Sequence, residues 1–94
     1  MRENITRIDG NNLTIKQMAN LRILDLSFNL IRKIEHLELL QNLRELNLSY
    51  NHIKVMENIK FPSMHTLDLS HNKITKIKNI RGLRKLERLN LDGN

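Results

Sequence analysis

The side chains in this sequence best suited to acid–base chemistry are two aspartates in equivalent positions, Asp25 and Asp68. Amides fill the same position in the other two equivalent segments, at Asn47 and Asn90. If the segments are neighbouring parallel strands, about 4.8 Å apart, the two carboxylates lie two strands, or about 10 Å, from each other. This separation exceeds those that paired carboxylates use in acid catalysis. The alternation of acid and amide is therefore interpreted as a way to keep like charges off adjacent strands, and no catalytic residue is predicted.

Histidine is the other residue type that could support chemistry, here as a metal ligand. The chain has four histidines: His36, His52, His65 and His71. His65 and His71 are six residues apart, which in an extended chain separates them by up to about 20 Å. No two histidines have the i, i+4 helical spacing, with a carboxylate close by, that is typical of a zinc site. The histidines are interpreted as surface residues, and neither a metal nor another cofactor is expected.

The most regular polar feature is a series of asparagines spaced 22, 21 and 22 residues apart: Asn29, Asn51, Asn72 and Asn94. Each one closes the pattern apolar-x-x-Leu-x-Leu-x-x-Asn. Where a strand ends and the backbone turns, inward-facing amide and carbonyl groups lose their sheet partners. An inward asparagine carries both a donor and an acceptor, so it can bond to both kinds of group. The series is therefore predicted to be a structural ladder of buried carboxamides.

Two hydrophobic periodicities define the elements that position this ladder. Within each pattern the leucines alternate with polar residues, which predicts a short strand with its leucines inward. After each of the first three asparagines, apolar residues recur about every third position, which predicts one or two turns of 3₁₀- or α-helix. These residues are Ile31, Ile34, Leu37 and Leu40, then Ile53, Met56, Ile59 and Phe61, then Ile74, Ile77, Ile80 and Leu83. Each unit is then a strand followed by a return arc.

Stacking such units in parallel predicts an α/β fold: a right-handed solenoid with a short parallel β-sheet on the concave face and 3₁₀ or short helical arcs on the convex face. The predicted repeats are 21–42, 43–63, 64–85 and a terminal strand at 86–94, preceded by a partial N-terminal cap or half repeat at 1–20. An uncapped last strand exposes leucines and a strand edge. We therefore expect a longer protein, a partner over that strand, or a homo-oligomer.

The pattern, repeated four times in register, resembles the leucine-rich repeat, and its length is that of the 22-residue class. This class is found in the regulatory subunit of type-1 protein phosphatase, in centriolin, in dynein light chain 1 and in tubulin-folding cofactor E. The Leu-Asn-Leu-Ser-Tyr-Asn stretch at 46–51 is most similar to centriolin. The resemblance covers residues 21–94 and, less closely, 5–20. It implies a non-enzymatic protein-binding module in an intracellular adaptor of centrosomal, ciliary or phosphatase-regulatory assemblies.

The chain contains no cysteine, which excludes disulfides, thiolate nucleophiles and thiolate zinc sites. Extracellular repeat proteins usually rely on disulfide caps, so a reducing compartment is expected. No apolar run approaches the roughly 20 residues of a membrane span, and the first residues lack the apolar stretch of a secretory signal. No membrane association is expected. The predicted location is the cytoplasm, including the centrosome or cilium, with the nucleus left open.

One column of side chains is the candidate binding site for a protein partner. The eighth position of the pattern holds Phe28, Tyr50 and His71 on consecutive repeats. Stacked repeats place these rings together at the rim of the concave face. Two interpretations stay open: a hot spot for a partner, or rings that only cover the turn and each other. The other candidate contacts on the concave face are Asp25, Glu45, Asn47, Asp68 and Arg88.

The formal net charge of +6 is uneven, because residues 1–47 carry +1 and residues 48–94 carry +5. The excess lies in a cluster of Lys73, Lys76, Lys78, Arg81, Arg84, Lys85 and Arg88. One interpretation is a solvated convex face. The alternative is a face for an acidic partner or nucleic acid, which would make the chain a ribonucleoprotein accessory domain acting through residues 73–88. No aromatic residue is interleaved with the cluster, which disfavours stacking on bases.

Overall fold

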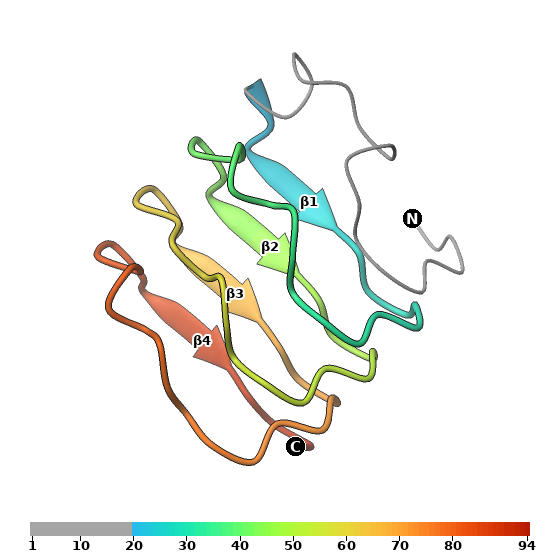
Figure 1. Cartoon of the computed structure of the whole chain (residues 1–94). Coiled ribbons are helices and arrows are strands. Elements are labelled where there is room, and N and C mark those ends of the chain that lie inside the picture. Colours follow the sequence, from blue (N-terminus) through green and yellow to red (C-terminus); the bar gives the residue numbers. More distant parts are fainter. Residues whose placement is uncertain (1–19) are drawn as a thin grey trace.

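Four short strands form one parallel sheet in chain order, β1-β2-β3-β4 (Figure 1). In this computed structural model, which describes residues 20–94, the strands are β1 at Ile23–Asp25, β2 at Glu45–Asn47, β3 at Thr66–Asp68 and β4 at Arg88–Asn90. The central leucines of successive strands are paired in register, from Leu24 through Leu46 and Leu67 to Leu89. Equivalent residues of successive repeats therefore lie side by side, about 4.8 Å apart. The predicted solenoid and its parallel sheet are confirmed.

Between the strands, the chain returns past the sheet in long arcs (Figure 1). The arcs contain turns closed by single backbone hydrogen bonds, such as Leu40 N to Leu37 O at 3.0 Å and Leu83 N to Ile80 O at 3.1 Å. These bonds join residues three apart, as in a 3₁₀-helix, but no helix develops within the described arcs. The predicted helical arcs are therefore corrected to irregular arcs with isolated turns.

Two physical reasons keep the arcs from being helical. One residue in each arc has a left-handed backbone, with φ of 61° at His36, 56° at Asn58 and 60° at Asn79. A left-handed residue interrupts a right-handed helix. The arc must also carry the chain back along the strand direction, and extended chain advances about 3.3 Å per residue, against about 2.0 Å in a 3₁₀-helix. Apolar residues spaced by three are buried equally well by this bent, extended chain.

The core lies between the sheet and the arcs, and its coverage depends on the next repeat. In the first two arcs, Ile34 and Met56 are both 0% exposed. In the third arc, Ile77 is 65% exposed and Ile80 is 44% exposed, although both belong to the same apolar series. Each coil of a solenoid covers the one before it. Within residues 20–94 no arc packs over these two isoleucines, because only β4 follows the third arc there.

Each strand begins two residues after the start of a predicted repeat, at positions 23, 45, 66 and 88. The partial cap predicted for residues 1–20 falls on residues 1–19, which lie outside the described residues, and on residue 20. Within residues 20–94, no helix is both long enough and apolar enough to cross a membrane.

Candidate functional site

The asparagine ladder lies inside the turn that follows each strand. Asn51 shows its bonding: Nδ2 donates to Leu48 O of the same repeat at 2.9 Å and to Leu26 O of the preceding repeat at 3.0 Å. Oδ1 accepts from Ile31 N at 3.0 Å, at the start of the preceding arc. Asn72 makes the equivalent bonds one repeat further on. Asn51, Asn72 and Asn94 each close their own turn and join two repeats. The first three members are buried and the last is exposed: Asn29, Asn51, Asn72 and Asn94.

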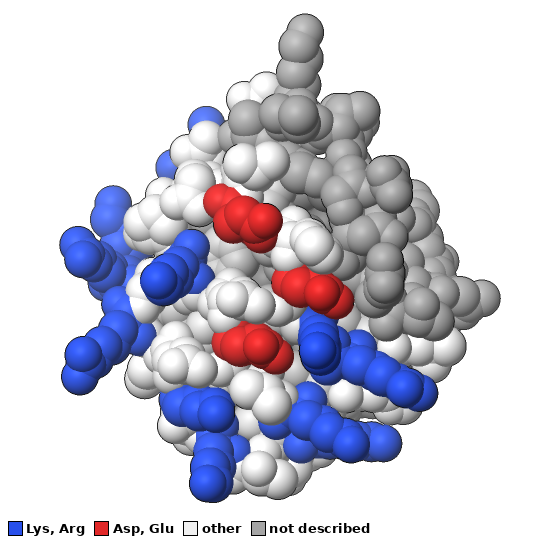
Figure 2. Space-filling model, in the orientation of Figure 1, with Lys and Arg blue, Asp and Glu red and all other residues white. Residues whose placement is uncertain are grey.

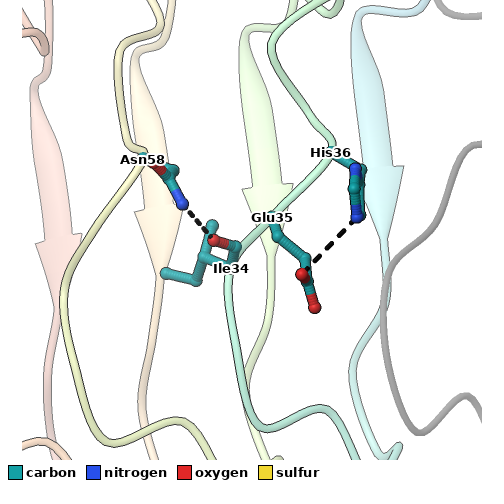
Figure 3. A network of polar contacts seen from close by, with 4 residues as sticks. All are labelled: Ile34, Glu35, His36 and Asn58. Atoms are coloured by element: carbon teal, nitrogen blue, oxygen red, sulfur yellow. Dashed lines mark hydrogen bonds and ion pairs between the residues drawn. The ribbon is translucent and has the colours of Figure 1, made fainter.

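A second ladder on the arcs was not predicted from the sequence. It consists of the left-handed residues His36, Asn58 and Asn79. Asn58 Nδ2 donates to Ile34 O of the preceding repeat at 2.8 Å (Figure 3). Asn79 Nδ2 donates to Met56 O in the same way, at 2.5 Å. The signal was present in the sequence, because two asparagines stand one repeat length apart and asparagine is among the few residues that adopt this backbone conformation readily.

The predicted column of outward acids and amides occupies the last residue of each strand. Asp25 Oδ1 accepts from Ser27 N at 2.9 Å and from Ser27 Oγ at 2.6 Å. Asn47 Oδ1 accepts from Ser49 N and Oγ at the same two distances, 2.9 Å and 2.6 Å. Asp68 repeats the arrangement in the next strand. The aspartates and the asparagine therefore form the same structure, an Asx turn that holds the chain as it leaves the sheet.

Asp25 adds a pH dependence to this turn. The hydrogen bond from the Ser27 hydroxyl, assisted by the one from the Ser27 backbone N–H, holds the pKa of the Asp25 carboxyl below its ordinary value. A carboxyl whose pKa is lowered by folding stabilises the protein above its unfolded-state pKa, and this contribution is lost as the pH falls through the folded-state pKa. We expect the free energy of unfolding to decrease between about pH 5 and about pH 2, and to decrease less in Asp25→Asn. Urea unfolding of both proteins across this range measures the difference. Equal decreases would show that Asp25 does not contribute.

Phe28, Tyr50 and His71 form a continuous stack at the exit end of the strands. The ring centroids of Phe28 and Tyr50 are 4.3 Å apart with 8° between their planes, and those of Tyr50 and His71 are 4.3 Å apart with 12°. Parallel pairing continues into this turn, where Phe28 N donates to Ser49 O at 3.0 Å. The pairing keeps the rings one strand spacing apart. Phe28 is 43% and Tyr50 45% exposed, and His71 is exposed as well. We name these three residues the ring column.

The ring column has an unusual backbone. The φ angles are left-handed at every position, with 56° at Phe28, 56° at Tyr50, 53° at His71 and 73° at the fourth equivalent residue, Gly93. This conformation is uncommon for aromatic residues, and it is retained only where the surroundings impose it. A Cβ atom on Gly93 would lie 2.5 Å from His71 Nδ1. The His71 imidazole therefore rests on the glycine backbone, and a side chain at position 93 would displace it.

The last two predicted contacts, Glu45 and Arg88, are exposed on the outward face of β2 and β4. Strand register aligns them with two other outward residues in one row across the sheet: Ile23, Glu45, Thr66 and Arg88. This row lies at the entry end of the strands, whereas the ring column lies beyond the exit end. The outward sheet residues and the ring column together make up the candidate site.

The histidines are distributed over the surface. His36 Nε2 lies 3.5 Å from Glu35 Oε1 on the first arc (Figure 3), and His65 Nε2 lies 3.7 Å from Glu87 Oε2. Across residues 20–94, no group of three or more histidine, aspartate or glutamate side chains is placed to hold a metal ion.

Comparison with known sequences agrees with this geometry. A family model of the leucine rich repeat matches residues 2–53 and again residues 42–94. No curated protein matches the chain. The two family matches together span nearly all of the sequence, and the parallel sheet and the asparagine ladder follow the same repeat. The chain belongs to the leucine-rich-repeat family.

Proposed function

We propose that this chain binds a protein partner through the outward face of its sheet and the ring column. Leucine-rich repeats generally mediate protein–protein interaction, and they are typically non-enzymatic. The observation that carries the proposal for this chain is the stack of Phe28, Tyr50 and His71. It offers aromatic surface that is already fixed in place and still exposed.

The ring column suits an interface for an energetic reason. Aromatic side chains contribute much of the binding energy of protein interfaces, because they bury large areas and lose little rotamer freedom. Here the stacking already restricts Tyr50 on both ring faces, so little further order has to be imposed on binding. The left-handed backbone that presents the rings is a strained conformation of the kind that gathers at functional sites.

We place the chain in an intracellular adaptor as part of the same proposal. The 22-residue repeat resembles those of centrosomal, ciliary and phosphatase-regulatory proteins, and without cysteine the chain cannot form the disulfides that are common in extracellular domains. Immunofluorescence of the tagged chain tests this assignment. A diffuse signal with no centrosomal or ciliary enrichment would count against those two locations.

Replacing Tyr50 with alanine should weaken partner binding by about 30-fold, equivalent to about 2 kcal/mol at a hot spot. The physical reason is the loss of the central ring, which leaves its two neighbours without their stacking partner. The measurement is the affinity for the partner captured from lysate by the intact chain. Leu39→Ala is the control, because Leu39 is an equally exposed apolar residue on an arc, at 51%. Equal losses in the two variants, or no loss in either, would contradict the proposed site.

The basic cluster supports a second candidate function, nucleic-acid binding. All seven side chains of the cluster are exposed, and none forms an ion pair within residues 20–94. Affinity for RNA should then fall steeply with salt. For each phosphate contacted, the logarithm of the association constant should fall by about 0.7–0.9 for every tenfold rise in salt concentration. Filter binding at several salt concentrations decides this. A shallow salt dependence would leave the cluster as a solvated face.

A further inference from the structure

We propose that the partner of this sheet is a basic polypeptide segment, rich in lysine or arginine and carrying an apolar side chain. The proposal rests on the proposed function, and it names the chemistry of the partner at the same site. Its origin is a separation of charge within the molecule: the chain as a whole carries +6, but the outward face of the sheet is acidic.

The outward positions of the four strands hold three carboxylates and one guanidinium, a net charge of −2: Ile23, Asp25, Glu45, Asn47, Thr66, Asp68, Arg88 and Asn90. Most of the positive charge lies elsewhere, with six lysines and arginines on the third arc at 73–85. Figure 2 looks onto the arcs, opposite the outward face of the sheet, and shows acidic side chains near the centre of that side with lysine and arginine side chains around them. The sheet is therefore acidic within a protein that is basic overall.

The three carboxylates lie on neighbouring strands, with Asp25 on β1, Glu45 on β2 and Asp68 on β3. The two aspartates are about 10 Å apart, and Glu45, on the strand between them, lies two residues nearer the entry end of the strands. Glu45 and Asp68 form no ion pair with a lysine or arginine of the described chain. Three acidic groups within this distance complement cationic side chains that alternate along an extended segment, which are about 7 Å apart.

Apolar groups lie at both ends of the outward face. Ile23, at the entry end, is 62% exposed. The ring column lies beyond the exit end, with Tyr50 45% exposed. A segment running along the strands meets Ile23 and Glu45 first, then the two aspartates, then the aromatic rings. Basic residues flanked by apolar ones match this order, whereas an acidic segment would bring like charges together and lose binding energy.

The repeats themselves supply a variant that removes the charge and keeps the fold. Asn47 makes the same Asx turn as Asp25, with the same distances of 2.9 Å and 2.6 Å to its serine. Asp25→Asn and Asp68→Asn should therefore keep their turns, and the exposed Glu45 tolerates Glu45→Gln. These three changes together define the sheet variant.

The matched control removes three carboxylates from the arcs instead, through Glu35→Gln, Glu38→Gln and Glu57→Gln. This arc variant has the same net charge as the sheet variant, so it separates the place of the charge from its total. Glu35 lies on the first arc beside His36 (Figure 3), away from the strands. Tyr50→Ala completes the set and reports on the proposed function itself.

The experiment is selection of random dodecapeptides displayed on phage against the intact chain at physiological ionic strength, where the positive charge of the arcs is screened beyond about 8 Å. We expect the selected peptides to be enriched in lysine or arginine next to an apolar residue. Their affinity should fall about tenfold on the sheet variant and should be unchanged on the arc variant.

The outcomes separate the two proposals. Peptides that lose affinity on Tyr50→Ala but not on the sheet variant overturn the basic partner and leave the proposed function standing. Acidic or neutral peptides, equal losses on the sheet and arc variants, or no enrichment above background also overturn the basic partner. Peptides that are insensitive to both Tyr50→Ala and the sheet variant overturn the binding site as well.

Discussion

Replacing Asn51 with leucine should lower the free energy of unfolding by at least about 2 kcal/mol. The carboxamide of Asn51 donates to Leu26 O and Leu48 O and accepts from Ile31 N. Leucine removes all of these bonds while keeping the side chain buried. Each buried backbone group left without a partner costs about 1–3 kcal/mol. Two or more such groups would cost a large part of the total stability of a small domain.

The control for this prediction is the same change at the end of the ladder, Asn94→Leu. Asn94 Nδ2 donates to Leu69 O and Leu91 O, each at 2.9 Å, and its Oδ1 accepts from Ile74 N at 3.0 Å, but the residue is exposed. Water can replace these bonds, so the loss should be smaller, at about 1 kcal/mol or less. Urea unfolding of the two variants gives both values. Similar losses at the two positions would show that burial of the amide is not what makes the ladder stabilising.

The sequence was sufficient to predict the strands and the ladder because both depend on local patterns. A period-two alternation places Leu46 inward and Glu45 outward, whatever the rest of the chain does. Repetition of the same pattern one repeat later then leaves parallel stacking as the arrangement that buries every copy. The inward asparagine follows from the same register, since the position that closes each pattern lies where the strand pairing ends.

The arcs could not be predicted from hydrophobic spacing, because two backbone conformations bury the same residues. Apolar side chains at every third position fit a 3₁₀-helix, and they also fit the bent chain that the structure has. The residues that decide between the two are polar. Asn58 and Asn79 are left-handed and bond to the preceding arc, which interrupts any helix there.

The sequence predicted that the rings of the candidate site come together, but not the backbone conformation that holds them. Equivalent positions in stacked repeats bring Phe28 and Tyr50 together, and this much follows from the repeat. The face-to-face geometry depends on left-handed backbone at both residues, which no hydrophobic pattern indicates. The Asx turn at Asp25 did have a local signal, a serine two residues later in each of the first three repeats. The alternation of acid and amide predicted the outward position of Asp25 but not its bond to Ser27.

Truncating Leu67 to alanine should lower the free energy of unfolding by about 2–5 kcal/mol. Leu67 is 0% exposed, and it is paired in register with Leu46 on one side and Leu89 on the other. The cavity left behind is closed by core on both sides, so the surrounding chain has little freedom to fill it. Leu67→Val, which removes less volume, provides a graded measurement if the alanine variant does not fold.

The same truncation at Leu89 distinguishes the role of the neighbouring repeats from that of the leucine itself. Leu89 is only partly buried, because β4 is the edge strand of the sheet that residues 20–94 form. In a solenoid each repeat is stabilised mainly by its immediate neighbours, so Leu89→Ala should cost clearly less than Leu67→Ala. Guanidinium unfolding monitored by circular dichroism compares the two. If the two costs are equal, contacts between adjacent repeats are not the main source of stability. The rigidity of the sheet that presents the acidic face and the ring column would then have another origin.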